Sequence, residues 1–302
     1  GDALVRGAVA LSLRLDVSAV LVSVTIVGFG TSAPELLISI QAALAGSPGI
    51  ALGNVVGSNI ANVLMVLGVP ALLAPIAGCG AEAHRNLLVM LGVTALFTGL
   101  ALTGTIQWWG GLLLVAAAAA MIWDSIRDAR RAKAAARSEA LEELAELGAT
   151  PESTGVWRTA AFIGAGIVGL PLGAHLLVEG ARGMAQEFGV SEAAIGLTIV
   201  AVGTSLPELA TTVMAALRRH SDVAIGNVIG SNIFNITAIA GAAAMVHPLE
   251  VPGEILSRDL WCMIGASILL TPLVLFRHRI GRRVGTAFVL LYGTYVYLAL
   301  AG

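Results

Sequence analysis

A six-residue motif that occurs twice, each time inside a long apolar run, constrains this chain more than any other feature. GTSAPE covers residues 30–35, and GTSLPE covers residues 203–208, a shift of 173 positions. The longer motifs GNVVGSNIAN at 53–62 and GNVIGSNIFN at 226–235 keep the same shift. Repetition at a fixed spacing without a gap indicates an internal duplication, so the two halves are predicted to share one fold.

The composition places this duplication in a lipid bilayer. Of the 302 residues, 57% are hydrophobic and only 12% are charged, which is too little charge to cover a soluble protein of this size. The apolar runs also reach the roughly 20 residues that a helix needs to cross a membrane. We therefore expect an all-α polytopic membrane protein whose surroundings are lipid, with no nucleic-acid partner, no obligate protein partner and no cofactor.

The apolar runs predict ten transmembrane helices in two five-helix repeats. The repeats cover residues 1–126 and 157–302, joined by a linker at 127–156. Residues 1–13 are too short to span a bilayer, although their counterpart at 157–183 is full length, so we expect roughly 15–20 further apolar residues upstream. The other predicted spans are 18–45, 49–72, 86–103, 107–126, 157–184, 190–217, 223–246, 258–276 and 283–301.

Charged residues predict the orientation of the two repeats. The linker is polar, with a basic cluster at 127–137 followed by an acidic cluster at 139–146. Five spans in the first half turn the second half upside down relative to the first. With the linker in the cytoplasm, all 17 Lys and Arg residues except Arg6, Arg182 and Arg258 lie on the cytoplasmic side, as basic loops usually do. We therefore predict an inverted repeat in a cytoplasmic (inner) membrane.

The repeated motifs contain the chemistry of a site for hard cations. Pro34 and Pro207 lack an amide hydrogen, so each interrupts its helix just before Glu35 or Glu208 and frees a backbone carbonyl. Free carbonyls, hydroxyls and carboxylates are ligands that suit Na⁺ or Ca²⁺ rather than zinc or copper. A carboxylate buried in a membrane span is costly, and two at equivalent positions indicate function.

The second motif adds a polar stripe to the following helix of each repeat. Asn54, Ser58 and Asn62 recur every four residues and therefore share one helix face. Their equivalents are Asn227, Ser231 and Asn235. The stripes and the two carboxylates are predicted to meet near the middle of the membrane, where the stripe residues bind the ion directly or support its ligands.

The motifs resemble the two alpha-repeats of the cation/calcium exchanger superfamily, in particular the prokaryotic sodium/calcium exchangers. The resemblance covers essentially the whole chain and implies an antiporter that moves Ca²⁺ against Na⁺ by alternating access. It implies Ca²⁺ ligands at Glu35 and Glu208, with backbone oxygens near Thr31 and Thr204. The implied Na⁺ ligands are Ser32, Ser58, Ser205, Ser231 and the backbone oxygens of Gly28 and Ala201, with Asn62 as a central polar group.

One position departs from part of that superfamily's pattern. Many prokaryotic and potassium-dependent relatives have Asp where this chain has Asn235, so the centre here becomes Glu, Asn, Glu, Asn. Its two negative charges match one Ca²⁺, and each Na⁺ beyond two would leave net positive charge in a medium of low dielectric constant. The Asn argues against potassium cotransport and leaves the Na⁺:Ca²⁺ ratio open.

Other functions remain as alternatives at this stage. An antiporter coupled to protons, or one for another divalent cation, uses the same carboxylates, although the neighbouring hydroxyls favour Na⁺. A cation channel needs a continuous pore, and interrupted helices around a central site fit a transporter better. A hydrolase needs a nucleophile with a base, and neither polar stripe contains His or Lys. We therefore expect a secondary transporter and not an enzyme.

Overall fold

The protein is described from a computed structural model. The structure describes residues 31–77, 80–131 and 201–301, together with a few positions between 157 and 172. The first stretch at 1–13, the beginning of the span predicted at 18–45, most of the span predicted at 157–184, residues 190–200 of the span predicted at 190–217 and most of the linker lie outside the described residues. Gly28 lies outside them as well.

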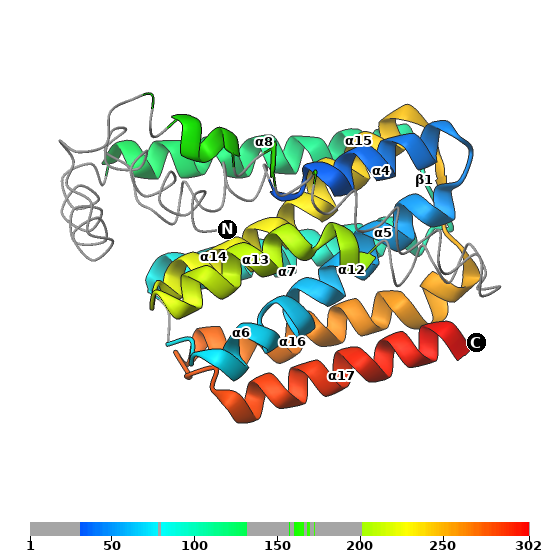
Figure 1. Cartoon of the computed structure of the whole chain (residues 1–302). Coiled ribbons are helices and arrows are strands. Elements are labelled where there is room, and N and C mark those ends of the chain that lie inside the picture. The colour runs from blue at the N-terminus through cyan, green and yellow to red at the C-terminus, as the bar shows by residue number, and fades with distance from the viewer. Residues whose placement is uncertain are drawn as a thin grey trace.

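The described residues form long helices joined by short turns (Figure 1). The described helix ends lie within a few residues of the predicted ones, with two exceptions. The helix predicted at 86–103 begins at Ala81, and the helix predicted at 107–126 continues to Arg131, into the predicted linker. The first half contains α4 (Ala33–Leu44), α5 (Pro48–Ala61), η2 (Asn62–Val66), α6 (Gly68–Leu73), α7 (Ala81–Ala101), β1 (Thr105–Ile106) and α8 (Trp108–Arg131). The second half contains α12 (Ala201–Thr204), α13 (Leu206–Leu217), α14 (Ser221–Phe234), η4 (Asn235–Ile239), α15 (Ala240–Val246), β2 (Leu249–Glu250), η5 (Ile255–Asp259), α16 (Leu260–Leu275) and α17 (Arg282–Ala301).

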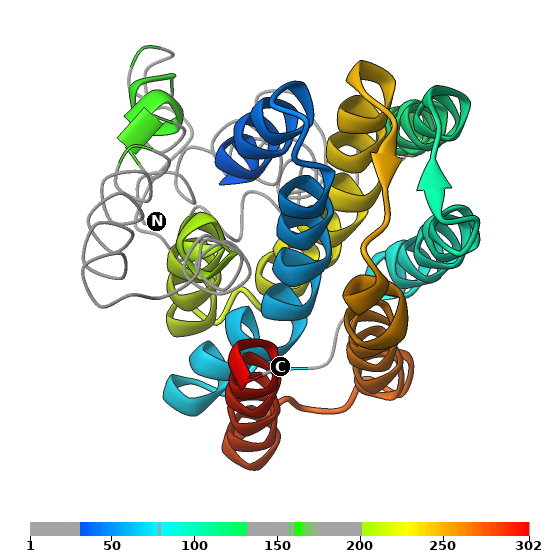
Figure 2. The same cartoon turned by 90° about the vertical axis from the view of Figure 1, so that its right-hand side faces the viewer.

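Two of these helical stretches form the centre of the molecule. In the described part of the chain, Pro48–Leu73, Ala83–Ala101, Ser221–Val246 and Ile255–Leu275 are long and apolar enough to cross a membrane. In the stretches that contain α5 and α14, 89% and 78% of the apolar window is buried, against 50% and 39% in those containing α7 and α16. The central stretches therefore hold the polar stripes in the interior, while α7 and α16 face outward (Figure 2).

The two halves pack against each other through equivalent contacts. Helix α6 of the first half lies against α17 of the second, and α15 of the second half lies against α8 of the first. Gly68 and Gly285 bring the first pair of backbones together, and Gly111 and Gly241 do the same for the second pair. Gly68 and Gly241 are equivalent positions in the duplication, so α17 packs on the polar-stripe stretch of the first half and α8 packs on that of the second.

Short backbone pairings show the same equivalence at the two ends of the helices. Ile106 in β1 pairs with Leu249 in β2, antiparallel. Ile76, the equivalent of Leu249, pairs with Ile280 through two backbone hydrogen bonds of 3.0 and 2.9 Å. In Figure 1, β1 lies at one end of the helices, whereas α6 and the start of α17, which flank the other pairing, lie at the opposite end.

The glycine contacts predict a specific effect on stability. A Cβ atom at Gly285 would lie 2.8 Å from the carbonyl oxygen of Gly68 and 3.0 Å from Ala71, so Gly285→Ala has to push α6 and α17 apart. We expect it to lower the free energy of unfolding by about 1–3 kcal/mol. Gly293→Ala is the control, because the same helix has open space there. Thermal unfolding in detergent measures the melting temperature of both variants. Equal melting temperatures would contradict the close contact between α6 and α17.

Candidate cation site

Both carboxylates of the repeated motifs lie in the first turn of a helix and are buried. Glu35 is in α4 and Glu208 is in α13, with solvent exposures of 1% and 0%. Helix α12 ends at Thr204 and α13 begins at Leu206, so the predicted interruption before Pro207 is confirmed at Ser205. A carboxylate in a first turn is favoured by the positive end of the helix dipole, which helps to hold each Glu in place.

A hydrogen bond joins the two motifs across the duplication. The hydroxyl of Ser32 donates to Oε1 of Glu208 over 2.8 Å. The equivalent bond from Ser205 to Glu35 is absent, because neither the Ser205 hydroxyl nor either Glu35 oxygen has a hydrogen-bond partner among the described residues. Two equivalent sequences therefore form an asymmetric pair of contacts.

The unpaired oxygens define what the site requires. Oε2 of Glu208 and both carboxylate oxygens of Glu35 are buried without a hydrogen-bond donor in the described structure. The two carboxylates also interact electrostatically with each other. Buried anions without a compensating charge are costly, so this pair requires a cation or protons.

Neutral oxygen ligands surround the carboxylates. Thr31, Ser32, Thr204 and Ser205 from the first motif of each repeat are at most 1% exposed. Ser58 in α5 and Ser231 in α14 are also buried, and their hydroxyls have no hydrogen-bond partner within the described part of the chain. The set therefore combines two charged and several neutral oxygens, which matches Na⁺ and Ca²⁺.

The two central asparagines stand at helix irregularities that the sequence did not reveal. Asn62 begins the π-helical turn η2, and Asn235 begins the equivalent turn η4. All four of their side-chain amide atoms are buried and unpaired among the described residues. Such π-helical turns occur often at functional sites, and here they place two neutral amides in the centre of the molecule.

Ala201, whose backbone carbonyl is an expected ligand, is 1% exposed. Its carbonyl oxygen accepts hydrogen bonds from the Ser205 amide at 3.2 Å and from the Thr204 hydroxyl at 3.3 Å. An ion that binds this carbonyl therefore shares it with donors of its own repeat.

Sequence analysis missed three hydroxyl residues that support the motifs. Ser39, Thr211 and Thr212 are buried next to the asparagines of the polar stripes. Their signal was available, because Ser39 lies four residues after Glu35, and Thr212 lies four residues after Glu208. Residues four apart on a helix share a face.

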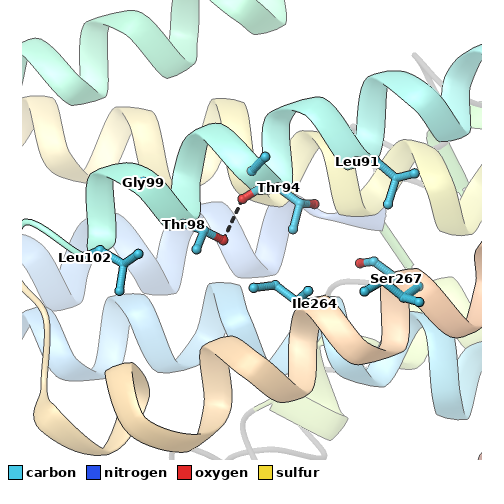
Figure 3. Close-up of a pocket in the computed structure, with 9 residues that line it drawn as sticks. Leu91, Thr94, Thr98, Gly99, Leu102, Ile264 and Ser267 are labelled. Carbon is cyan, nitrogen blue, oxygen red and sulfur yellow. Dashed lines mark hydrogen bonds between the residues drawn. The ribbon is translucent and has the colours of Figure 1, made fainter.

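A hollow between α7 and α16 has a different lining from the cation site (Figure 3). The hydroxyls of Thr94, Thr98 and Ser267 in its wall donate to carbonyls one turn back in their own helices, at 2.7, 2.7 and 3.0 Å. The other lining residues are apolar side chains and Gly99. None of the residues that line this hollow of about 340 Å³ is charged, so its wall provides no carboxylate for a cation.

The family model described as sodium/calcium exchanger protein matches residues 1–126 and 158–301. The chain belongs to the sodium/calcium exchanger family. It is 36% identical to the putative antiporter CaxA of Alkalimonas amylolytica, over 98% of this chain and 93% of that protein.

Other relatives of the exchanger come from bacteria and archaea. It is 34% identical to the inner membrane protein YrbG of Escherichia coli, over 99% of this chain and 91% of that protein. It is 32% identical to the sodium/calcium exchanger MaX1 of Methanosarcina acetivorans, over 96% of this chain and 91% of that protein. A solved structure of the sodium-calcium exchanger NCX_Mj, soaked with Na⁺ and Ca²⁺, superimposes with a TM-score of 0.81 at 28% identity, covering 98% of this chain and 92% of that one.

These relatives settle the class of protein. The family consists of secondary transporters rather than enzymes, so the chain is a transporter. The apolar helices and the membrane-protein relatives make it a multi-pass membrane protein.

The buried charges predict how ions affect the stability of the protein. In buffer without divalent cations or Na⁺, Glu35→Gln removes an uncompensated buried charge, so we expect a higher melting temperature than in the wild type. Adding Ca²⁺ should stabilise the wild type by about 2.7 kcal/mol at a hundredfold excess over its dissociation constant, and the variant much less. Glu254→Gln, at an exposed carboxylate, is the control. A Ca²⁺-induced shift that stays the same in Glu35→Gln would rule out this carboxylate as a ligand.

Proposed function

We propose that the chain exchanges Na⁺ for Ca²⁺ across the cytoplasmic membrane by alternating access at one central site. The observation that carries the proposal is the pair of buried carboxylates, Glu35 and Glu208, one from each repeat. Three of their four oxygens have no hydrogen-bond donor among the described residues. Their two negative charges equal the charge of one Ca²⁺. The family and the fold shared with NCX_Mj support an antiporter of this type.

Competition for the same carboxylates explains the exchange. In this proposal Ca²⁺ binds Glu35 and Glu208, with backbone oxygens near Thr31 and Thr204. The Na⁺ ions bind the same carboxylates with neutral oxygens around them. These oxygens come from Ser32, Ser58, Ser205, Ser231, Gly28 and Ala201, with Asn62 and Asn235 in the centre. Binding of one kind of ion therefore displaces the other. The two fluxes are coupled if the site opens to the other side of the membrane only when its carboxylates are neutralised.

The proposed architecture is a pair of inverted five-helix repeats with ten spans in total. The repeats are residues 1–126 and 157–302, joined by a cytoplasmic linker at 127–156. Equivalent contacts at opposite ends of the helices support the inversion. The basic loops lie on the cytoplasmic side, in the orientation predicted from their charge.

Uptake of radioactive Ca²⁺ into membrane vesicles tests the proposal. Vesicles loaded with Na⁺ and diluted into Na⁺-free buffer should take up Ca²⁺, whereas vesicles loaded with choline at the same pH should not. Glu208→Gln should abolish uptake, because one of the two ligand charges is gone. Uptake driven equally well by a pH gradient without Na⁺ would move the assignment to a proton-coupled antiporter. Uptake that needs no counter-ion and does not saturate with Ca²⁺ would indicate a channel.

Protons should inhibit the exchange. A protonated carboxylate has no charge with which to bind Ca²⁺, so the Ca²⁺ concentration that gives half-maximal uptake should rise as the pH falls. The maximal rate at saturating Ca²⁺ should change less. Kinetics at several pH values with a constant Na⁺ gradient measure both quantities, and a half-maximal concentration that is independent of pH would contradict competition at the carboxylates.

A further inference from the structure

Two buried asparagines next to the carboxylates are outside the set of proposed ligands. Asn54 lies in α5 and Asn227 in α14, each 1% exposed. They are equivalent positions in the duplication, and each faces the neighbouring helix that carries a carboxylate.

The amide of Asn54 connects α5 to α4. Its Nδ2 donates to the backbone carbonyl of Glu35 at 3.1 Å and to the hydroxyl of Ser39 at 3.0 Å. An amide nitrogen has two hydrogens, so these two bonds use both. The amide oxygen lies 3.4 Å from the Thr204 hydroxyl of the other half, whose single hydrogen is shared with the Ala201 carbonyl at 3.3 Å. Both amide hydrogens of Asn54 are therefore used on α4, the helix that carries Glu35.

Asn227 repeats the arrangement in the second half. Its Nδ2 lies 3.3 Å from the backbone carbonyl of Glu208 and 2.9 Å from the hydroxyl of Thr212. Thr212 is the equivalent of Ser39. Nδ2 of Asn227 is also 2.9 Å from the Thr211 hydroxyl, so its two hydrogens are shared among three acceptors, of which the Glu208 carbonyl is the most distant. The oxygen of Asn227 has no hydrogen-bond partner in the part of the chain that is described. Contacts to the carbonyl of the Glu residue and to the hydroxyl one turn later occur in both halves, which indicates a common role.

The bonds hold the backbone at the point where the helix begins. The first turn of a helix follows an interruption, so the preceding residues restrain it poorly. The amide fixes the carbonyl of Glu35 or Glu208 itself and the hydroxyl one turn later. Two anchors on one face prevent the turn from rotating about its axis, and that rotation would move the carboxylate away from the ion.

We propose that Asn54 and Asn227 are positioning residues of the exchange site, which set its ion affinity by fixing the backbone of the two ligand carboxylates. The inference rests on the proposed function. Residues that orient metal ligands from behind typically contribute 10–100-fold in metal affinity. The asparagines therefore lower the dissociation constant for Ca²⁺, whereas Glu35 and Glu208 supply the negative charge that binds it.

Binding of radioactive Ca²⁺ to the purified protein, with transport kinetics in vesicles, tests the role of Asn54. Asn54→Ala should raise the half-saturating Ca²⁺ concentration about 10–100-fold. The uptake rate at saturating Ca²⁺ should stay near that of the wild type, because the ligands remain. Asn59→Ala is the matched control, since Asn59 is also buried in α5 but donates to the carbonyl of Val55 in its own helix, at 2.7 Å.

A double-mutant cycle separates positioning from a general loss of stability. If Asn54 acts through Ser39 and Glu35, then Ser39→Ala weakens Ca²⁺ binding in the wild type but adds little to Asn54→Ala. Fully additive effects, or wild-type affinity in Asn54→Ala, would overturn the proposal. Should Asn54→Ala fail to fold, Ser39→Ala and Thr212→Ala, which each remove one partner, test the same bonds.

Glu208→Gln, measured in parallel, distinguishes this proposal from the exchange function itself. Loss of Ca²⁺ binding in Glu208→Gln together with wild-type affinity in Asn54→Ala would reject the positioning role and leave the exchange function standing. Unchanged binding in both variants would reject both. Loss in Glu208→Gln with a shifted, saturable affinity in Asn54→Ala supports both.

Discussion

Two carboxylates buried in the centre of an apolar helix bundle are the constraint on which the rest of this structure depends. Glu35 and Glu208 have solvent exposures of 1% and 0%, and three of their four oxygens have no hydrogen-bond donor among the described residues. Such a pair is stable only with a cation or protons nearby. The interrupted helices, the surrounding hydroxyls and the asparagines that hold the backbone all place these charges where an ion can neutralise them.

The site is asymmetric although the two repeats have nearly the same sequence. Ser32 donates to Glu208, while Ser205 and Glu35 remain apart, and Thr204 bonds to Asn54, while the oxygen of Asn227 is unpaired among the described residues. Nothing in the local sequence favours one set of bonds over the equivalent one. In the proposed alternating-access mechanism, the equivalent set of bonds would form when the site opens to the other side.

Much of the fold and of the site could be predicted from the sequence, because apolar run length and the constant spacing of the motifs are local signals. The helix ends, the interruption at Ser205 and the burial of the motif residues follow from them. The π-helical turns at Asn62 and Asn235 could not be predicted, since they depend on how α5 and α14 pack. The same holds for the approach of Gly285 to Gly68, which joins residues far apart in the chain. Ser39 and Thr212 could have been found, because they lie one turn after the carboxylates.

The glycine contacts between the halves bear on how such a chain could arise. The polar-stripe stretch of each half packs against a helix of the other half, through Gly68 with Gly285 and Gly241 with Gly111. An ancestral protein of half this length would have needed a second copy to cover the same surface, so its assembly would have depended on its concentration in the membrane. Fusion of the two copies into one chain replaces that concentration by a fixed, high effective concentration. It also lets the copies diverge separately, so that a residue such as Asp259 can occupy a position where the other half has Asn86.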